Sequence, residues 1–333
     1  MPTEQEILKV IRKIIPNSKK YLFDDSAIIE KNLIVTTDTL VENTHFVKTY
    51  KPEDIGWKAM AVNLSDIAAM GGKPLYALVS LSLPANIKIK WIKNFYKGLV
   101  TCAKKYRTQI IGGNLARSRE INITITIIGR IVRAGARPAQ RSSAKPGDLI
   151  FTTGTFGDSA CGYLLLNNLV IASKAKQSHK AIKGNKIASS LSLLAMTKKN
   201  KTPTPQINLG QKIVTLTKRS ALMDASDGLA DCLIQIANQS NVKIVVNKDK
   251  IPVSINTKKA SQMLNKNPIN LALYGGEDYQ LVGTTSKFDC KKLMKLKEIK
   301  IIGKVIKGKG AFLKQDNSKL VRLDTKKIYE HFS

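Results

Sequence analysis

The sequence predicts a mixed α/β protein with two domains. Three observations favour this class: the 333 residues exceed one typical compact core, strand-like and helix-like patterns are interspersed, and a turn at Pro146-Gly147 precedes a fresh strand. We therefore expect an N-terminal α+β domain over residues 1–147 and a C-terminal α/β domain over residues 148–333.

Helix and strand patterns alternate through the first domain. Residues 1–15 place their isoleucines and Leu8 on one helical face and carry acids early, which predicts an amphipathic helix and not a signal peptide. Residues 55–70 have helical spacing that stops at Gly71-Gly72. The remaining segments read as strands over 33–41, 76–84 and 121–132, a helix over 91–106, and a strand over 108–111 that runs into a glycine turn.

The second domain continues with strand patterns that end in glycine-containing corners. We expect strands from residue 148, over 221–226 and over 243–254, and a helix after Asp227-Gly228. Residues 171–202 break the pattern because they are rich in Ser and Lys and nearly free of acids. We expect part of that stretch to form a surface insertion without a functional role.

The charge and cysteine content exclude some classes of protein. The chain carries 55 Lys and Arg against 24 Asp and Glu, a net charge of +31, which suits a polyanionic partner such as nucleic acid or anionic lipid. However, the lysines are dispersed and aromatic residues are only 6%, so we expect no dedicated nucleic-acid partner. No apolar run approaches the ~18 residues of a membrane span, so we expect no membrane association.

Four cysteines, Cys102, Cys161, Cys232 and Cys290, stand far apart with no CxxC pair. This spacing indicates neither a zinc site nor a disulfide framework. A cytoplasmic location is expected, because free thiols suit a reducing compartment.

Aspartates that stand in apolar surroundings are the strongest functional signal. A buried carboxylate without a partner is costly, and none of these has a Lys or Arg at helical or cross-strand spacing in its own segment. An all-oxygen ligand set suits a hard cation, Mg²⁺ in particular where phosphate also binds. Each could instead be a helix cap, a turn former or half of a salt bridge. The residues are Asp25, Asp38, Asp66, Asp224 and Asp227.

Asp224 and Asp227 flank Ser226 where a strand gives way to a helix. Such a corner can direct a carboxylate at a metal while the hydroxyl and free N–H groups face a phosphate. Simple capping of the helix by Ser226 or Asp227 is the alternative. Two glycine segments, 111–114 and 153–159, also have the character of phosphate loops, although neither is a Walker motif or a GxGxxG fingerprint.

Two further features have ambiguous roles when taken alone. Glu277 and Asp278 follow Gly275-Gly276, which places two acids on a glycine corner that could meet a cationic or hydroxylated substrate. A turn with exposed acids is the alternative. His45 follows the strand that carries Asp38, and a single histidine at such a position is usually structural.

These motifs resemble, in order along nearly the whole chain, those of thiamine-monophosphate kinase. That family lies in an ATP-binding superfamily with aminoimidazole ribonucleotide synthetase and selenide water dikinase. The segments are FDDSAII, TTDTLVENTHF, IGWKAMAVNLSDIAAMGGKP, IIGGN, KPGDLIFTTGTFGDSACG, DASDGLADCL and YGGEDYQL.

The resemblance implies a homodimer formed through the N-terminal sheet and transfer of the ATP γ-phosphoryl group to thiamine monophosphate. No protein nucleophile is implied, because metals can neutralise and align two polyanions. Magnesium would be bound by Asp25, Thr36, Thr37, Asp38, Asp66, Asn114, Asp224 and Asp227. ATP would meet Gly113, Asn114, Arg141 and Ser226, and thiamine monophosphate would meet His45, Glu277 and Tyr329.

Two positions depart from the family pattern. Asn114 stands where many members have a metal-binding Asp, and Gln206 replaces a commonly seen Arg. A superfamily member with another acceptor, or a basic nucleic-acid-binding protein on a decayed kinase scaffold, are the competing interpretations. The first is disfavoured because no Cys precedes the first domain, and the second because the aspartates are intact.

Overall fold

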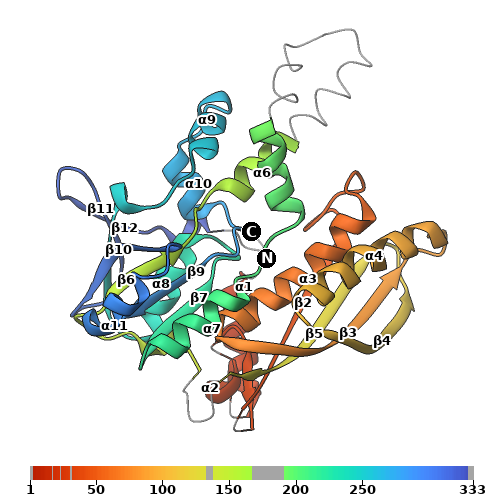
Figure 1. The fold of residues 1–333 in the computed structure, drawn as a ribbon, viewed down its shortest axis with the longest axis horizontal. Coiled ribbons are helices and arrows are strands. Elements are labelled where there is room, and N and C mark those ends of the chain that lie inside the picture. The colour runs from red at the N-terminus through yellow and green to blue at the C-terminus, as the bar shows by residue number, and fades with distance from the viewer. Residues whose placement is uncertain are drawn as a thin grey trace.

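The computed structural model describes residues 3–16, 18–22, 24–30, 32–132, 138–166 and 191–328. In these ranges the chain forms two β-sheets with helices packed on them, as Figure 1 shows. The mixed α/β class expected from the sequence is confirmed.

The N-terminal sheet has five strands in the order β1-β2-β5-β3-β4, and its β3–β4 pair is parallel while the other pairs are antiparallel. Helices α3 and α4 lie over one face of this sheet (Figure 1). The strands and helices are β1 (Ala27–Ile29), β2 (Leu33–Val41), β3 (Gly72–Leu83), β4 (Gln109–Arg117), β5 (Asn122–Ile131), α1 (Glu4–Ile14), α2 (Ser18–Tyr21), α3 (Pro52–Ala69) and α4 (Ile89–Lys105).

The C-terminal sheet has seven strands in the order β12-β11-β8-β10-β6-β9-β7. Its strands are β6 (Leu149–Thr153), β7 (Ser220–Asp224), β8 (Lys243–Asn247), β9 (Leu281–Thr285), β10 (Ile299–Ile306), β11 (Gly310–Lys314) and β12 (Leu320–Arg322). The helices of this half are residues 158–166, α6 (Leu191–Lys201), α7 (Ile207–Leu216), α8 (Leu229–Gln239), α9 (Ile255–Met263), α10 (Pro268–Tyr274) and α11 (Lys287–Leu293). Short 3-10 segments occupy Arg141–Ser143, Lys248–Lys250 and Thr325–Lys327.

Helix α3 joins the two halves. It packs on β2, β3 and β5 of the first sheet and also contacts β7 and α7 of the second half. Gly210 of α7 permits this contact, because a Cβ there would lie 2.1 Å from the Ala68 carbonyl oxygen. One apolar core runs from Ile34 to Leu222 and Leu281. The division at residue 147 falls between the two sheets but stays a prediction, since they share this core.

Two local expectations need correction in the first domain. The glycine turn expected after residue 111 is wrong, because β4 continues through Gly112 and Gly113 to Arg117 while pairing with β3. The helix of residues 55–70 stops where expected, with Gly71 at φ +66°. The strand expected over 76–84 begins earlier than expected, because β3 starts at Gly72 directly after this turn. Pairing with a neighbouring strand has overridden local turn preference in both places.

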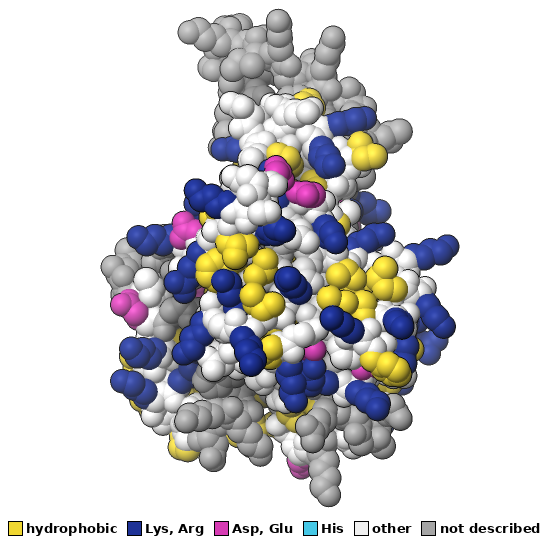
Figure 2. Space-filling view, turned by 90° about the vertical axis from the view of Figure 1, so that its left-hand side faces the viewer, with side chains coloured by type: hydrophobic (Ala, Val, Ile, Leu, Met, Phe, Trp, Pro, Cys, Tyr) yellow, Lys and Arg dark blue, Asp and Glu magenta, His cyan; other side chains and the backbone are white. Residues whose placement is uncertain are grey.

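No helix in the described ranges is long and apolar enough to cross a membrane. On the face drawn in Figure 2, Lys and Arg side chains are scattered among apolar ones and do not form a single stripe. This distribution is that of a solvated basic surface, as expected from the dispersed lysines.

Candidate active site

Three of the predicted aspartates meet where the two halves join. Asp25 precedes β1, Asp66 lies near the end of α3, and Asp224 ends β7. Each offers a carboxylate oxygen, and these oxygens all lie within 4.8 Å of one another. Segments about 200 residues apart in sequence therefore converge on a point that a single cation could contact.

The electrostatics of this cluster are those of crowded, desolvated carboxylates. Burial raises the pKa of Asp66 well above its usual range, and the charges of Asp38, Asp224 and Asp25 raise it further. Burial and the Asp25 charge likewise raise the pKa of Asp224. Like charges held this close oppose one another unless a proton or a cation is shared between them. The cluster thus has the donor set and the charge that a divalent cation requires.

The alternation of strand β2 places the predicted ligands Thr36, Thr37 and Asp38 on two faces. Thr36 faces α3, and its hydroxyl donates to Asp66. Asp38 has the same orientation in the pleat, and its backbone N–H donates to Asn63 Oδ1 at 2.9 Å. The Thr37 side chain is exposed on the opposite face and accepts a 3.0 Å hydrogen bond from Thr126. The structure therefore does not bring the Thr37 hydroxyl to the cluster.

Arg141 reaches the cluster from a different segment and binds Asp25. Its Nη2 lies 2.7 Å from Asp25 Oδ1 and its Nε donates to Oδ2 at 3.3 Å. Burial lowers the pKa of Arg141, but the Asp25 carboxylate outweighs burial and leaves it raised. The absence of a local basic partner was correctly read from the sequence, and the partner of Asp25 comes from 116 residues away.

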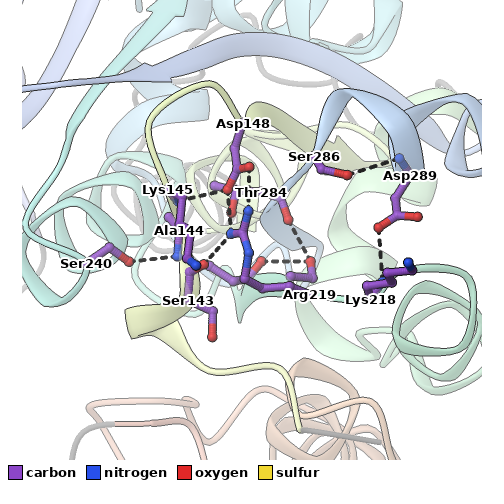
Figure 3. A network of polar contacts seen from close by, with 12 residues as sticks. Ser143, Ala144, Lys145, Asp148, Lys218, Arg219, Ser240, Thr284, Ser286 and Asp289 are labelled. Atoms are coloured by element: carbon purple, nitrogen blue, oxygen red, sulfur yellow. Dashed lines mark hydrogen bonds and ion pairs between the residues drawn. The ribbon is translucent and has the colours of Figure 1, made fainter.

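The segment that carries Arg141 is fixed by a network of polar contacts (Figure 3). Ser240 Oγ donates to the Arg141 carbonyl at 2.8 Å and accepts from the Ala144 N–H at 3.0 Å. In the same network, Arg219 donates to both oxygens of Asp148 at 2.6 and 2.7 Å. This network holds the backbone of Arg141, and the two bonds to Asp25 orient its guanidinium.

The corner after β7 has the form that the sequence predicted. β7 ends at Asp224, and α8 begins at Leu229. The N-cap of α8 is Gly228, at φ +106° and without a side-chain cap. Ser226 and Asp227 are therefore not helix caps, and Ser226 Oγ instead donates to Asp227 Oδ2 at 3.2 Å. Both residues lie in the loop that connects Asp224 to α8.

In the loop over residues 153–159, the N–H groups of Gly157 and Ser159 are bonded within the protein. The Gly157 and Ser159 N–H groups donate to the two carboxylate oxygens of Asp278, at 2.6 and 3.1 Å. Burial nevertheless raises the pKa of Asp278 to about 7. Asp278 thus ties the glycine corner 275–279 to the start of the helix over 158–166, which is a structural role.

Glu277 and His45 meet at a buried lysine that the sequence did not single out. Lys58 Nζ lies 2.6 Å from Glu277 Oε1 and donates to the His45 carbonyl at 3.0 Å. The second oxygen of Glu277 accepts from Asn200 Nδ2 at 2.7 Å. The orientation of the His45 ring is set by a local hydrogen bond, in which Nδ1 accepts from the Val41 N–H at 3.0 Å. The structure thus brings both predicted substrate residues to one place.

The structure does not bring every predicted residue to the acid cluster or to the Lys58–Glu277 pair. Gly113 and Asn114 are exposed on β4, the edge strand, with β3 and β5 between them and β2, so one chain does not bring them to the acid cluster. Gln206 is the N-cap residue of α7 and donates to the Thr204 carbonyl at 3.0 Å. Tyr329 lies outside the described residues.

The stretch 171–202 is described only at its C-terminal end. Residues 167–190 lie outside the described ranges, but the stretch ends in α6, where Asn200 is buried and contacts Tyr50, Ser159 and Glu277. The surface insertion, expected for only part of the stretch, therefore does not extend to Asn200, and the expected lack of a functional role stays a prediction. Lys58, Asn63 and Asn200 were all missed, and a buried lysine in an apolar helix is the one signal that could have been noticed.

The chain is similar to known proteins over most of its length. The family model "AIR synthase related protein, N-terminal domain" matches residues 23–131. Thiamine-monophosphate kinase of Aquifex aeolicus is 34% identical over 310 residues, covering 92% of each chain, and that of Bacillus subtilis is 37% identical over 309 residues, covering 90% of this chain and 88% of that one. A solved structure, AaThiL complexed with AMPPCP and TMP, superposes with a TM-score of 0.83 at 33% identity and covers 99% of this chain and 97% of that chain. Similarity at this level over whole chains shows that the chain belongs to the thiamine-monophosphate kinase family.

Proposed function

We propose that this protein transfers the γ-phosphoryl group of ATP to thiamine monophosphate, giving thiamine diphosphate and ADP. The observation that carries the proposal is the cluster of Asp25, Asp66 and Asp224 at the junction of the two halves. Relatives named for this activity and a solved relative that holds an ATP analogue together with TMP support the choice of substrates.

Mg²⁺ suits the cluster because all of its donors are oxygens and because the carboxylates oppose one another without a cation. Asp25, Asp66 and Asp224 would hold it, with Asp38, Asp227 and the Thr36 hydroxyl beside them. When bound, it supplies neutralisation of the phosphate charges and alignment of the two reacting groups. The protein residues then position the two substrates, and none needs to act as a nucleophile.

Arg141 is the protein's own cation at the nucleotide end. Its guanidinium now binds Asp25 and has five N–H donors, of which those facing away from Asp25 suit a phosphate oxygen. Ser226 lies next to Asp227 and would present its hydroxyl to the same phosphates. The ATP polyphosphate is thus expected between η1 (Arg141–Ser143) and the corner after β7.

Glu277 and His45 form the acceptor end. Glu277 remains 30% exposed although both its oxygens are bonded, so it can face a cationic ligand. Thiamine monophosphate carries a positive ring and a negative phosphate, which matches a carboxylate at one end of the site and a metal-bound phosphate at the other. Tyr329 is proposed as a further contact from its motif.

We propose a homodimer formed on the open face of the N-terminal sheet. Tyr76 and Leu78 of β3 are 42% and 38% exposed on this face, which no helix of the described ranges covers. Gly113 and Asn114 lie at the edge of the same sheet. A partner subunit on this face would bring its β4 near the site of the first subunit. Gly113 and Asn114 of one subunit could then contact a nucleotide bound to the acid cluster of the other.

The decisive experiment is a coupled assay of ADP release with thiamine monophosphate present or absent, first with Mg²⁺ and then with EDTA. We expect release only when both thiamine monophosphate and Mg²⁺ are present. Release that ignores thiamine monophosphate but follows another phosphorylated acceptor would contradict the proposed substrate.

A further inference from the structure

Lys58 is buried to an extent that is unusual for a lysine. Its side chain is 1% exposed, and it lies in α3 among buried apolar residues such as Ile55 and Ala59. An ammonium group at this depth costs several kcal/mol unless it is paired and hydrogen-bonded. The contacts of the Lys58 ammonium must therefore offset the cost of burying its charge.

The partners of Lys58 belong to the acceptor end of the site. Nζ makes the ion pair with Glu277 Oε1 at 2.6 Å and donates to the His45 carbonyl at 3.0 Å. Asn200 holds the other oxygen of Glu277 and is itself fixed, because its Oδ1 accepts from the Tyr50 hydroxyl at 2.6 Å. The Glu277 carboxylate is consequently locked in one orientation from both sides.

The backbone around Glu277 is also in a conformation that needs support. Gly276, Glu277 and Tyr279 have φ values of +68°, +57° and +50°, and such values cost a non-glycine residue about 1 kcal/mol or more. The Glu277 N–H donates to the Ser226 carbonyl and the Tyr279 N–H donates to the Ala225 carbonyl at 3.0 Å. These bonds fix the corner to the loop after β7, while Lys58 and Asn200 fix its side chain.

Helix α3 relates this lysine to the acid cluster. Lys58 and Asp66 are eight residues apart on one helix, which separates them by about 12 Å along its axis. Helix α3 thus sets the distance between the acid cluster, which would meet the phosphate, and Glu277, which would meet the acceptor ring.

We infer that Lys58 is a positioning residue that acts through Glu277 and the His45 turn to set the acceptor end of the site. The inference rests on the proposed function and deepens it. The two groups that Lys58 Nζ bonds are the Glu277 carboxylate and the His45 carbonyl. Lys58 orients Glu277 and sets its distance from the acid cluster, so its loss affects recognition of thiamine monophosphate and not of ATP.

A double-mutant cycle of Lys58→Met, Glu277→Gln and the combined variant tests this inference. We expect K58M to raise KM for thiamine monophosphate about tenfold, a change of ~1.4 kcal/mol, with KM for ATP within about twofold of wild type. We expect the combined variant to match E277Q alone, because Lys58 acts through Glu277. Thermal unfolding of each variant is measured in parallel, since removing one member of a buried pair is destabilising.

Two further variants keep the test decisive. Asn200→Ala removes the second anchor of Glu277 and leaves the Lys58 pair intact, so it should move KM for thiamine monophosphate in the same direction even if K58M does not fold. Lys292→Met is the control, because Lys292 also pairs with a buried carboxylate, Asp289 at 3.0 Å, but at the opposite end of β9. K292M should leave both KM values unchanged.

The outcomes separate this inference from the proposed function. A wild-type protein that does not phosphorylate thiamine monophosphate overturns the proposed function, and this inference with it. Wild-type turnover together with unchanged KM for thiamine monophosphate in K58M and N200A overturns the role of Lys58 alone. Equal rises in KM for both substrates, or fully additive effects in the cycle, would show a general structural role and overturn it as well.

Discussion

The guanidinium of Arg141 donates to both carboxylate oxygens of Asp25, through Nη2 at 2.7 Å and through Nε at 3.3 Å. Asp25 thus contacts a protein cation on one side and lies next to the carboxylates of Asp66 and Asp224 on the other. This arrangement links the proposed nucleotide end directly to the proposed metal cluster, because whatever binds one of them changes the charge that the other experiences.

Replacing Arg141 with Met should therefore weaken ATP binding selectively. The change removes a bidentate cation at the nucleotide end, and we expect KM for ATP to rise about tenfold or more, with KM for thiamine monophosphate little changed. Steady-state kinetics with each substrate varied in turn would check this. Equal KM values for ATP in R141M and wild type would contradict the assignment of Arg141.

The like charges of the cluster predict an unusual effect of Asp66→Asn on stability. In metal-free protein this change removes one of several opposed carboxylates, so we expect the melting temperature to rise. Mg²⁺ should stabilise wild type, by about 2.7 kcal/mol at a hundredfold excess over its Kd, and should stabilise D66N far less.

Thermal unfolding with EDTA and with Mg²⁺ would measure both effects. Asp54→Asn is the matched control, since Asp54 lies in the first turn of the same helix and outside the cluster. A D66N variant with an unchanged response to Mg²⁺ would exclude Asp66 as a ligand.

Asp278 predicts a pH dependence of stability. Burial raises its pKa to about 7 in the folded protein, whereas an unfolded chain has the ordinary value near ~3.9. The folded state therefore holds the proton more tightly, so the stabilisation is fully present below the unfolded pKa and is lost as pH rises through about 7. The free energy of unfolding of wild type should fall between about pH 4 and pH 7 by an amount that Asp278→Asn removes.

Urea unfolding at several pH values in EDTA would test this. Asp316→Asn is the control, because Asp316 is exposed and the Lys248 ammonium lowers its pKa, so it stays ionised throughout this range. Parallel pH profiles for wild type and D278N would contradict the prediction.

The sequence predicted the acid cluster because carboxylates are scarce in this chain and because Asp66 and Asp224 interrupt apolar patterns. Lys58 interrupts an apolar helix in the same way, but 55 basic residues made one more lysine inconspicuous. Asn200 could not be found, since it belongs to a compositionally biased stretch and acquires its role only through contacts with Tyr50 and Glu277. Local pattern reveals which side chains are costly to bury, whereas the fold alone decides which distant groups offset that cost.

The uncovered face of the N-terminal sheet predicts dimerisation that a single substitution should disrupt. Leu78 stands near the middle of this face, paired with Thr126 on one side and Gly112 on the other, and a carboxylate there would be buried without a partner in any dimer that covers it. We expect Leu78→Asp to shift the protein from dimer to monomer in sedimentation measurements and to reduce ATP turnover, since Gly113 and Asn114 would then reach no nucleotide.

Leu115→Asp is the control, and we expect it to leave the dimer intact. Leu115 is 73% exposed on the edge strand β4, but it pairs with Leu81 and so lies on the helix-facing side of the sheet. A dimer that survives L78D would contradict this location of the interface. An L78D monomer with full turnover would show that the site is complete within one chain.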